Sequence, residues 1–332
     1  MPSGPSQRRN ASPAQNGSRS ARALVPALAC AAIALLAAGS ATACSICRCG
    51  DPTFNALGLT GVPLSSVRVA LDWDRMDKSQ GSAGSGDFET ATEERLTALL
   101  GYSFSEAWTL FARLPRVDRE LTELEDGESD VTSTSGMADP EIYAQRRLWS
   151  STMDARVGVR DNVYAVFGVK TPWGENDLER DGARLDEHAQ PGSGSTDWYG
   201  GLSASHLLDR KSALFASVQY RATGSNDSGY EYGDVVLANL AYERKMSARW
   251  DAVVEANYRH AGRDRVSGGG HDPNTGGELL YVTPRVLVSV GPRWVLRASV
   301  QVPAWERLNG EQDEDAVYDL GVTYLVRSSR AE

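Results

Sequence analysis

The segment Ala316-Val-Tyr-Asp-Leu-Gly-Val-Thr-Tyr-Leu-Val326, close to the end of the chain, alternates between two kinds of side chain. One set of alternate positions is apolar or aromatic: Tyr318, Leu320, Val322, Tyr324 and Val326. The other set is mostly polar: Asp319, Gly321, Thr323 and Leu325. Because successive side chains of a β-strand point to opposite faces, this alternation predicts a strand with one apolar and one mostly polar face.

The same segment carries a short motif. Asp319, Gly321, Tyr324 and Val326 fit the pattern polar-x-Gly-x-x-aromatic-x-hydrophobic. This pattern resembles the C-terminal insertion signal of bacterial outer-membrane β-barrels, and the resemblance implies the barrel-assembly machinery and outer-membrane lipid as partners. Such a signal usually ends the chain, whereas residues 327–332 follow it here as a short tail. The last strand of a barrel must pair with the first, because an open sheet edge in lipid leaves backbone groups without hydrogen bonds.

The rest of the chain supplies enough strands for such a barrel. Twelve segments have strand-like patterns: 65–76, 91–104, 107–120, 138–149, 161–171, 196–207, 212–222, 232–244, 250–261, 277–290, 293–305 and 316–326. Most are 10 to 14 residues long, whereas strands of soluble sheets usually have about 5–6 residues and tilted membrane-spanning strands need about 9–11. Aromatic residues cluster at the segment ends, as they do in girdles at membrane interfaces. The alternative is a soluble β-sandwich whose aromatic side chains fill a core.

The links between these segments alternate in length. The short links are 105–106, 208–211, 245–249 and 291–292, and the longer link 150–160 is the exception among them. The long links, which are polar and rich in Gly and Asp, are 77–90, 121–137, 172–195, 223–231, 262–276 and 306–315. This asymmetry is typical of short periplasmic turns and long outer loops. We therefore predict an all-β fold, an antiparallel up-and-down transmembrane β-barrel of about twelve strands over residues 65–326, with both termini in the periplasm.

Residues 1–43 have the three parts of a secretory signal peptide. The basic region contains Arg8, Arg9, Arg19 and Arg22. Residues 23–39 form an uncharged apolar core, and Ala41-Thr42-Ala43 is an A-x-A cleavage site. We expect cleavage after Ala43, and together with the barrel pattern this indicates the outer membrane of a Gram-negative-type bacterium. The formal net charge of −10 argues against nucleic acid as a partner.

Three cysteines, Cys44, Cys47 and Cys49, follow the cleavage site, and residues 50–332 contain none. Their C-x-x-C-x-C motif lacks the following histidine of a haem-attachment motif. The thiolates could bind a soft metal ion such as copper or zinc, two of them could form a disulfide in the oxidising periplasm, or Cys44 could carry a lipid. We predict that residues 44–64 form a cysteine-bearing periplasmic segment or plug before the barrel.

Three elements in the middle of the chain form a further pattern. The first is G-x-K-x-P-x-G, with Gly168, Lys170, Pro172 and Gly174, and the second is Q-P-G-x-G-S, with Gln190, Pro191, Gly192 and Gly194. The third is Tyr232 followed by Gly233 and Asp234. In this order and spacing they resemble the outer-membrane β-barrel proteins named for the meta-pathway of phenol degradation, often simply called transporters. The resemblance extends over residues 65–326 and implies a barrel that passes or binds small molecules, without catalytic residues. Trp173 stands where that pattern has a small residue.

Charged residues on the polar faces of the strands are candidates for the barrel interior: Arg68, Asp72, Arg95, Arg113, Glu255, Arg259, Arg285, Arg297 and Asp319. Mixed charges inside a pore bias which solutes pass. The alternative is that these groups only pair with one another and fill a narrow lumen.

An enzyme is the competing class of function. The four histidines, His188, His206, His260 and His271, are not accompanied by a serine motif. No G-K-[ST] sequence follows the glycines at 268–270, so they do not form a phosphate-binding loop. We therefore predict no enzymatic activity and a porin-like channel or transporter for a small solute. The alternative is a barrel that anchors a periplasmic metal-binding or redox partner segment.

Overall fold

The structure is a computed structural model that describes residues 66–82, 87–125, 128–151 and 161–327. The predicted signal peptide, Cys44, Cys47, Cys49 and the end of the C-terminal tail lie outside the described residues. Within the described ranges, we find no helix that is long and apolar enough to cross a membrane.

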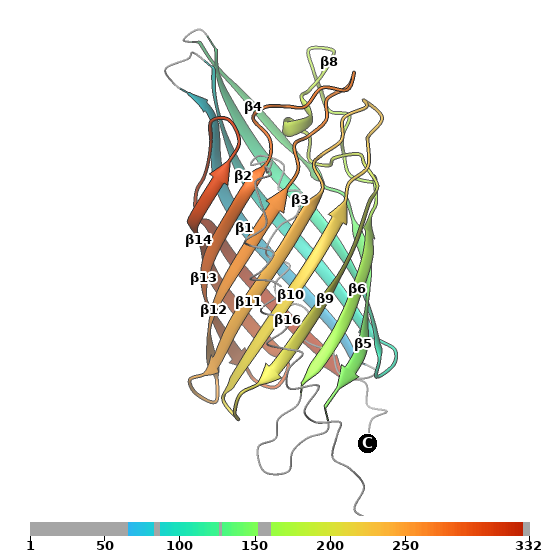
Figure 1. The fold of residues 1–332 in the computed structure, drawn as a ribbon, viewed down its shortest axis with the longest axis vertical. Helices are drawn as coiled ribbons and strands as arrows, with labels where there is room; N and C mark the ends of the chain where they lie inside the picture. Colours follow the sequence, from blue (N-terminus) through green and yellow to red (C-terminus); the bar gives the residue numbers. More distant parts are fainter. Residues whose placement is uncertain (1–65, 83–86, 126–127, 152–160, 328–332) are drawn as a thin grey trace, which may run out of the picture.

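The described residues form a closed ring of antiparallel strands (Figure 1). In ring order the twelve strands are β1 (Ser66–Ser82), β2 (Asp87–Ser103), β3 (Trp108–Glu125), β5 (Glu141–Ser150), β6 (Asn162–Lys170), β9 (Asp197–Leu207), β10 (Ser212–Ala222), β11 (Val235–Lys245), β12 (Trp250–Ala261), β13 (Gly277–Val290), β14 (Trp294–Leu308) and β16 (Val317–Arg327). The last strand, β16, pairs with β1 in a register that runs from Ser66 opposite Arg327 to Arg75 opposite Tyr318. The closed twelve-stranded barrel that the sequence predicts is therefore confirmed.

Four short strands and one short helix complete the described elements. β4 (Glu128–Met137) pairs with the upper part of β3, and β15 (Gln312–Glu314) pairs with the upper part of β1. β7 (Glu179–Arg180) and β8 (Ala183–Arg184) form a small hairpin, and η2 (Glu187–Ala189) is a single 3-10 turn. All of them lie at one end of the barrel, which we call the long-loop end (Figure 1). The opposite, short-turn end carries the links 104–107, 208–211, 246–249 and 291–293.

The prediction of long loops at 77–90 and 121–137 was wrong. β1 and β2 continue as one hairpin to Ser82 and from Asp87, and β3 and β4 form a second long hairpin. The reason is that the outward side chains here, such as Asp77 and Ser133, are polar, so the apolar half of the alternation is missing from the sequence. Polar outward faces are expected where strands extend beyond the lipid.

The outward face below these extensions is apolar. On β3, for example, Leu110 and Leu114 are 46% and 49% exposed, while Phe111 between them is 1% exposed and faces the interior. Trp250 and Trp294 begin β12 and β14 at the short-turn end, with rings on the outer surface. An apolar outer band with aromatic residues at its rim is the arrangement of a membrane-spanning barrel. The last strand follows the same rule, with Leu320 outward and Asp319 buried.

Candidate functional site: the barrel interior

The charged residues that the sequence places inside the barrel do face the interior. Glu255, Arg259 and Arg285 are 3% exposed or less, and Arg68 and Asp319 are less than a tenth exposed. The side chains of Asp72, Arg95, Arg113 and Arg297 are also largely covered. Because a buried charge requires a partner, the pairing of these groups decides what the interior can bind.

Four of the predicted charges form two ion pairs within the predicted set. Arg297 donates to Asp72, and Arg285 Nη1 lies 3.1 Å from Glu255 Oε1. Asp319 instead accepts a hydrogen bond of 3.0 Å from the hydroxyl of Ser299.

Arg95, Arg113 and Arg259 pair with carboxylates that are not in the predicted set. Arg95 pairs with Glu93 at 2.8 Å, Arg113 pairs with Glu141 at 3.2 Å, and Arg259 pairs with Glu314. Glu93 shares the inward parity of Arg95, and this signal could have identified it. Glu314 lies in a segment that was read as a loop, and Glu141 follows Pro140 at a break between β4 and β5, so neither has a clear alternation.

Each of these missed carboxylates serves two cations. Glu93 also accepts from Arg119 Nε at 3.1 Å, and Glu141 also accepts from Arg221 Nη2 at 2.8 Å. Glu314 lies 3.3 Å from Lys78 Nζ and accepts from the hydroxyl of Tyr281. Hydrogen bonds between a carboxylate and a charged donor are roughly twice as strong as neutral ones. The interior is therefore cross-linked between strands that are not neighbours in the ring, such as β5 and β10.

An aromatic row lies beside Glu141. Phe111 and Tyr143 stack at 4.7 Å with an angle of 14° between their planes, and the centroid of Tyr199 lies 6.4 Å from that of Tyr143. Gly168 lies between the last two, since a Cβ there would come within 2.6 Å of Tyr199 Cζ. The absence of a side chain at this position lets the rings lie against the barrel wall.

The segment 171–196 between β6 and β9 folds into the long-loop end, and the motif residues anchor it. Lys170 Nζ donates to Ser193 and, at 3.1 Å, to Ser195, both in the Q-P-G-x-G-S element. It also pairs with Asp139 at 3.2 Å and with Asp197 at 2.9 Å. The first two motif elements are thus brought together by one buried lysine.

The glycines of these elements allow the chain to approach Asp139. The Asp139 carboxylate accepts from the amides of Gly174 at 3.0 Å and Ser193 at 2.8 Å. A Cβ on Gly192 would come within 2.9 Å of Asp139 Oδ1, and a Cβ on Gly174 would come within 2.7 Å of it. Gln190 is buried and closes the loop through its amide group, which bonds to Leu178 and Leu185.

The remaining residues of the motifs have more peripheral places. Pro191 is buried, Pro172 is exposed, and Gly194 has a φ of 67°, which favours glycine. Trp173, which departs from the family pattern, is 70% exposed, so its ring does not occupy the packed part of the loop.

The third motif element, at 232–234, forms hydrogen bonds with residues of the neighbouring loops 223–231 and 262–276. The amide of Gly233 donates to Asp264 at 2.8 Å, and Asp234 accepts from the amide of Thr223 at 2.9 Å. Asn226 in the same loop donates to Glu187 at 2.9 Å. Arg184 also donates to Glu187, and this hydrogen bond raises the pKa of the Arg184 guanidinium above its ordinary value. The three motif elements therefore build one connected cap of loops.

Segment 171–196, which we call the inward-folded loop, also packs against the β3–β4 hairpin. Arg119 donates to the backbone carbonyls of His188 and, at 2.9 Å, of Gln190, and the Thr134 hydroxyl donates to the carbonyl of Ala189 at 2.6 Å. Ala189 packs with Ala91 and Leu121. The extended hairpins, which the sequence analysis read as loops, thus form the wall that supports this loop.

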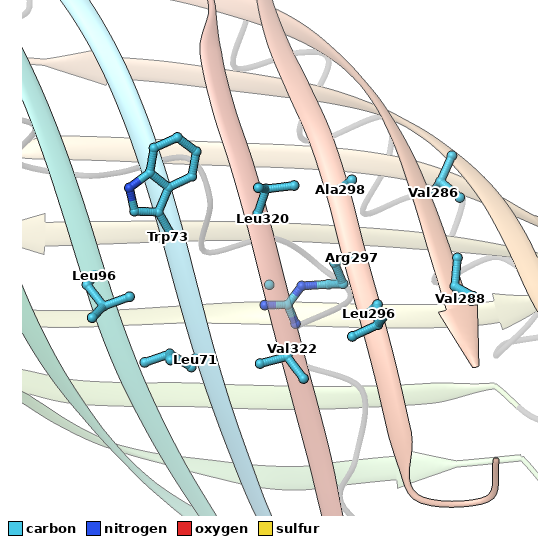
Figure 2. Close-up of a pocket in the computed structure, with 11 residues that line it drawn as sticks. Leu71, Trp73, Leu96, Val286, Val288, Leu296, Arg297, Ala298, Leu320 and Val322 are labelled. Carbon is cyan, nitrogen blue, oxygen red and sulfur yellow. The ribbon is translucent and has the colours of Figure 1, made fainter. Parts of the chain in front are cut away.

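The predicted insertion signal lies at the seam where the ring closes. The centroid of the Tyr324 ring lies 4.5 Å from that of Trp294, with the ring planes tilted by 43°, and Val326 is exposed on the outer face. A groove of about 500 Å³ crosses the outer face of this seam and is lined mainly by apolar side chains, including Leu71, Leu296 and Leu320 (Figure 2). It faces outward, because most of its lining side chains belong to the exposed set of each strand.

The histidines are spread over the barrel. His206 lies 2.5 Å from Asp161, His260 lies 3.7 Å from Glu278, and His188 contacts the hydroxyl of Tyr230 at 3.1 Å. His271 forms an isolated backbone bridge with Arg265. In the part of the chain that the structure describes, there is no group of three or more metal-binding side chains suited to hold an ion.

Comparisons with known proteins found one matching family and similar solved structures. A family model described as "Putative MetA-pathway of phenol degradation" matches residues 73–308. An outer-membrane channel from Pseudomonas putida F1 superposes with a TM-score of 0.60 at 15% identity, over 80% of this chain and 97% of that chain. The translocator domain of the autotransporter NalP from Neisseria meningitidis gives a TM-score of 0.47 at 13% identity, over 89% of this chain and 97% of that one. No curated protein matches the chain. The likeness to the Pseudomonas putida channel shows that the fold is that of an outer-membrane barrel.

Proposed function

The chain belongs to the MetA-pathway of phenol degradation family, and from this premise we propose that its barrel is an outer-membrane channel for a small solute. The observation that carries the proposal is the contrast between an apolar outer band and a charged, hydrogen-bonded interior. A barrel that served only as an anchor would not need charged groups inside, because burying them costs free energy. A lumen lined with both signs of charge is suited to pass polar or charged solutes selectively.

We place the short-turn end in the periplasm and the long-loop end outside the cell. The asymmetry of the links supports this orientation, since barrels inserted from the periplasm have short periplasmic turns. The orientation can be tested with epitope tags on intact cells. A tag inserted between Asp181 and Gly182, at the exposed tip of the β7–β8 hairpin, should bind antibody. A tag within 208–211 should bind only after the cells are opened, and the reverse pattern would invert the orientation.

Channel activity can be tested with the purified protein in planar lipid bilayers. We expect discrete conductance steps in potassium chloride, together with a mobility difference between boiled and unboiled samples on a gel. A protein that shows the mobility difference of a folded barrel but no conductance, and no solute uptake in proteoliposomes, would contradict the channel and leave the barrel intact.

The cysteine segment supports a second candidate function. Three cysteines within six positions, in a chain whose residues 50–332 contain none, are concentrated where a tethered metal-binding or redox segment would lie. In this proposal the barrel anchors the segment at the periplasmic face, and the ion would be copper or zinc.

A further inference from the structure

Glu141 is held by donors from three different strands. Arg113 Nη1 of β3 lies 3.2 Å from Oε2, Arg221 Nη2 of β10 lies 2.8 Å from Oε1, and the Tyr199 hydroxyl of β9 lies 3.3 Å from Oε2. All of these side chains are largely buried. Two guanidinium groups and a phenol that converge on two oxygens form the donor set that recognises a carboxylate. Any carboxylate at this position would find the same partners.

An aromatic surface adjoins this donor set. The Arg221 guanidinium lies 5.0 Å from the centre of the Tyr199 ring, and Tyr143 and Phe111 continue the row toward β3. Gly101 leaves room for the Phe111 ring, since a Cβ there would come within 2.6 Å of Phe111 Cε1. The three rings are 5% exposed or less, so an aromatic ligand would replace part of their present packing. Aromatic pairs gain free energy from stacking, which would offset this exchange.

The other shared carboxylates lack this combination. Glu93 shares Arg119 with two backbone carbonyls of the inward-folded loop, so its arginine is committed to holding that loop. Glu314 accepts from Tyr281, whose ring packs with the aliphatic residues Met76, Leu279 and Val317. Of these three sites, Glu141 is the one where two arginines lie beside a row of three aromatic rings.

The chain around Glu141 is also suited to an exchange of partners. Glu141 is the first residue of β5, directly after the break at 138–140 that separates β5 from β4. Its bond to Arg221 crosses the faces of β6 and β9, which lie between β5 and β10 in the ring. The pair therefore projects into the lumen and is not confined to one ladder of neighbouring strands.

We propose that Arg113, Arg221 and Tyr199 form a binding subsite for the carboxylate of a small aromatic acid, whose ring stacks on the adjoining aromatic row, and that Glu141 fills this subsite when the acid is absent. The inference rests on the proposed function, because the acid reaches the subsite through the lumen. Glu141 competes with the acid for these donors. The apparent affinity of the barrel for the acid is therefore reduced to the fraction of time in which Glu141 leaves the donors free.

The test measures benzoate binding to the detergent-solubilised full-length barrel by calorimetry, which does not depend on conductance. In Glu141→Gln the competing charge is absent, so benzoate should bind about tenfold more tightly than to wild type or better. Arg221→Met should abolish this binding, and Tyr199→Phe, which keeps the ring and removes one donor, should weaken it. Acetate should bind Glu141→Gln more weakly than benzoate, because it has no ring to stack.

The matched control is Glu255→Gln, which releases Arg285 without an adjoining aromatic row. An equal gain in benzoate affinity in this variant would show a general charge effect and overturn the subsite, and so would an unchanged affinity in Glu141→Gln. Gel mobility before and after boiling identifies any variant that fails to fold; should Arg221→Met fail, Tyr199→Phe decides. If the protein conducts ions but Glu141→Gln binds benzoate no more tightly than wild type, only the subsite is overturned. If the variants bind benzoate as expected but the protein does not conduct, only the channel is overturned.

Discussion

Arg297 of β14 reaches across β16 to donate to Asp72 of β1, and the residue beneath the pair is Gly321. The register places the three residues in one row, with Asp72 opposite Gly321 and Gly321 opposite Arg297. Figure 2 shows the Arg297 side chain running from β14 over β16 toward β1. The ion pair therefore links β1 to β14, the two strands on either side of β16. It lies directly over the glycine of the predicted insertion signal. In this chain that glycine has a structural reason, since it leaves the space that the pair needs.

Replacing Gly321 by alanine should destabilise the closure of the barrel. A Cβ at this position would come within 2.6 Å of Arg297 Nη2 and would also meet Asp72. Overpacking of this kind typically costs about 1–3 kcal/mol. We expect a lower temperature for the gel shift from folded to unfolded barrel. The control is Gly200→Ala, on the outer face of β9, where the new Cβ would come no closer than 3.7 Å to its neighbours. Equal stability of the two variants would contradict the role of the glycine.

Val322 and Thr323 of β16 point to opposite faces of the barrel wall, so a substitution by aspartate should have opposite outcomes at these two positions. Val322→Asp places a charge in the outer groove of the seam, which faces lipid, at a cost below the roughly 2–4 kcal/mol of a mid-bilayer Arg or Lys. Thr323→Asp places it inside, where the Thr323 hydroxyl now accepts from Arg297 at 3.2 Å. We expect loss of folded barrel from outer-membrane fractions for the first variant and near-normal levels for the second. Comparable levels of both variants would mean that the lipid face has been assigned wrongly.

The parts of the fold that could be predicted are those where one face meets lipid. The segments 212–222, 250–261 and 277–290 were predicted with the bounds that the structure has, because apolar residues such as Tyr220, Val254 and Val286 recur at every second position on their outer faces. The end of β3 and all of β4 were missed because their outer faces carry mostly polar residues in water. Their inner faces mix polar residues such as Thr132 and Thr134 with isolated apolar ones such as Leu121. Hydrophobic periodicity has no signal for a strand of that kind.

The interior charges illustrate a different limit. Alternation was enough to place Arg113 and Arg259 inside the barrel, because it depends only on neighbours in the sequence. It could not pair Glu141 with Arg221, which lie 80 positions apart and on strands separated by two others. The motif residues were recognised as a pattern, yet their common partner Asp139 was not, since nothing in the sequence distinguishes it from other loop aspartates.

The cysteine segment can be tested separately from the barrel. Replacing Cys44, Cys47 and Cys49 by serine should leave the gel shift and the conductance unchanged, because residues 50–332 contain no cysteine with which they could form a disulfide. Mass spectrometry of the mature wild-type protein should reveal a soft metal adduct, a loss of two hydrogens for a disulfide, or a diacylglyceryl group on Cys44. An unmodified, reduced N-terminus that takes up neither copper nor zinc would remove the second candidate function.

Lys170 is the residue on which the position of the inward-folded loop depends most. Its ammonium group pairs with Asp139 and Asp197 and donates to Ser193 and Ser195, all of them buried. Lys170→Met removes the cation and leaves two buried carboxylates without it, although Asp197 keeps Arg221 at 3.9 Å. Breaking a buried ion pair in this way costs about 3–5 kcal/mol.

We expect Lys170→Met to release the loop from the long-loop end, with a larger single-channel conductance and a lower unfolding temperature in detergent. Lys170→Arg keeps the charge and should recover part of both properties. The control is Lys211→Met, which removes an exposed lysine from the β9–β10 turn and should change neither. A folded Lys170→Met barrel with wild-type conductance would show that the loop does not narrow the pathway. In that case the narrowest part of the pathway would lie lower in the barrel, among the ion pairs between the strands.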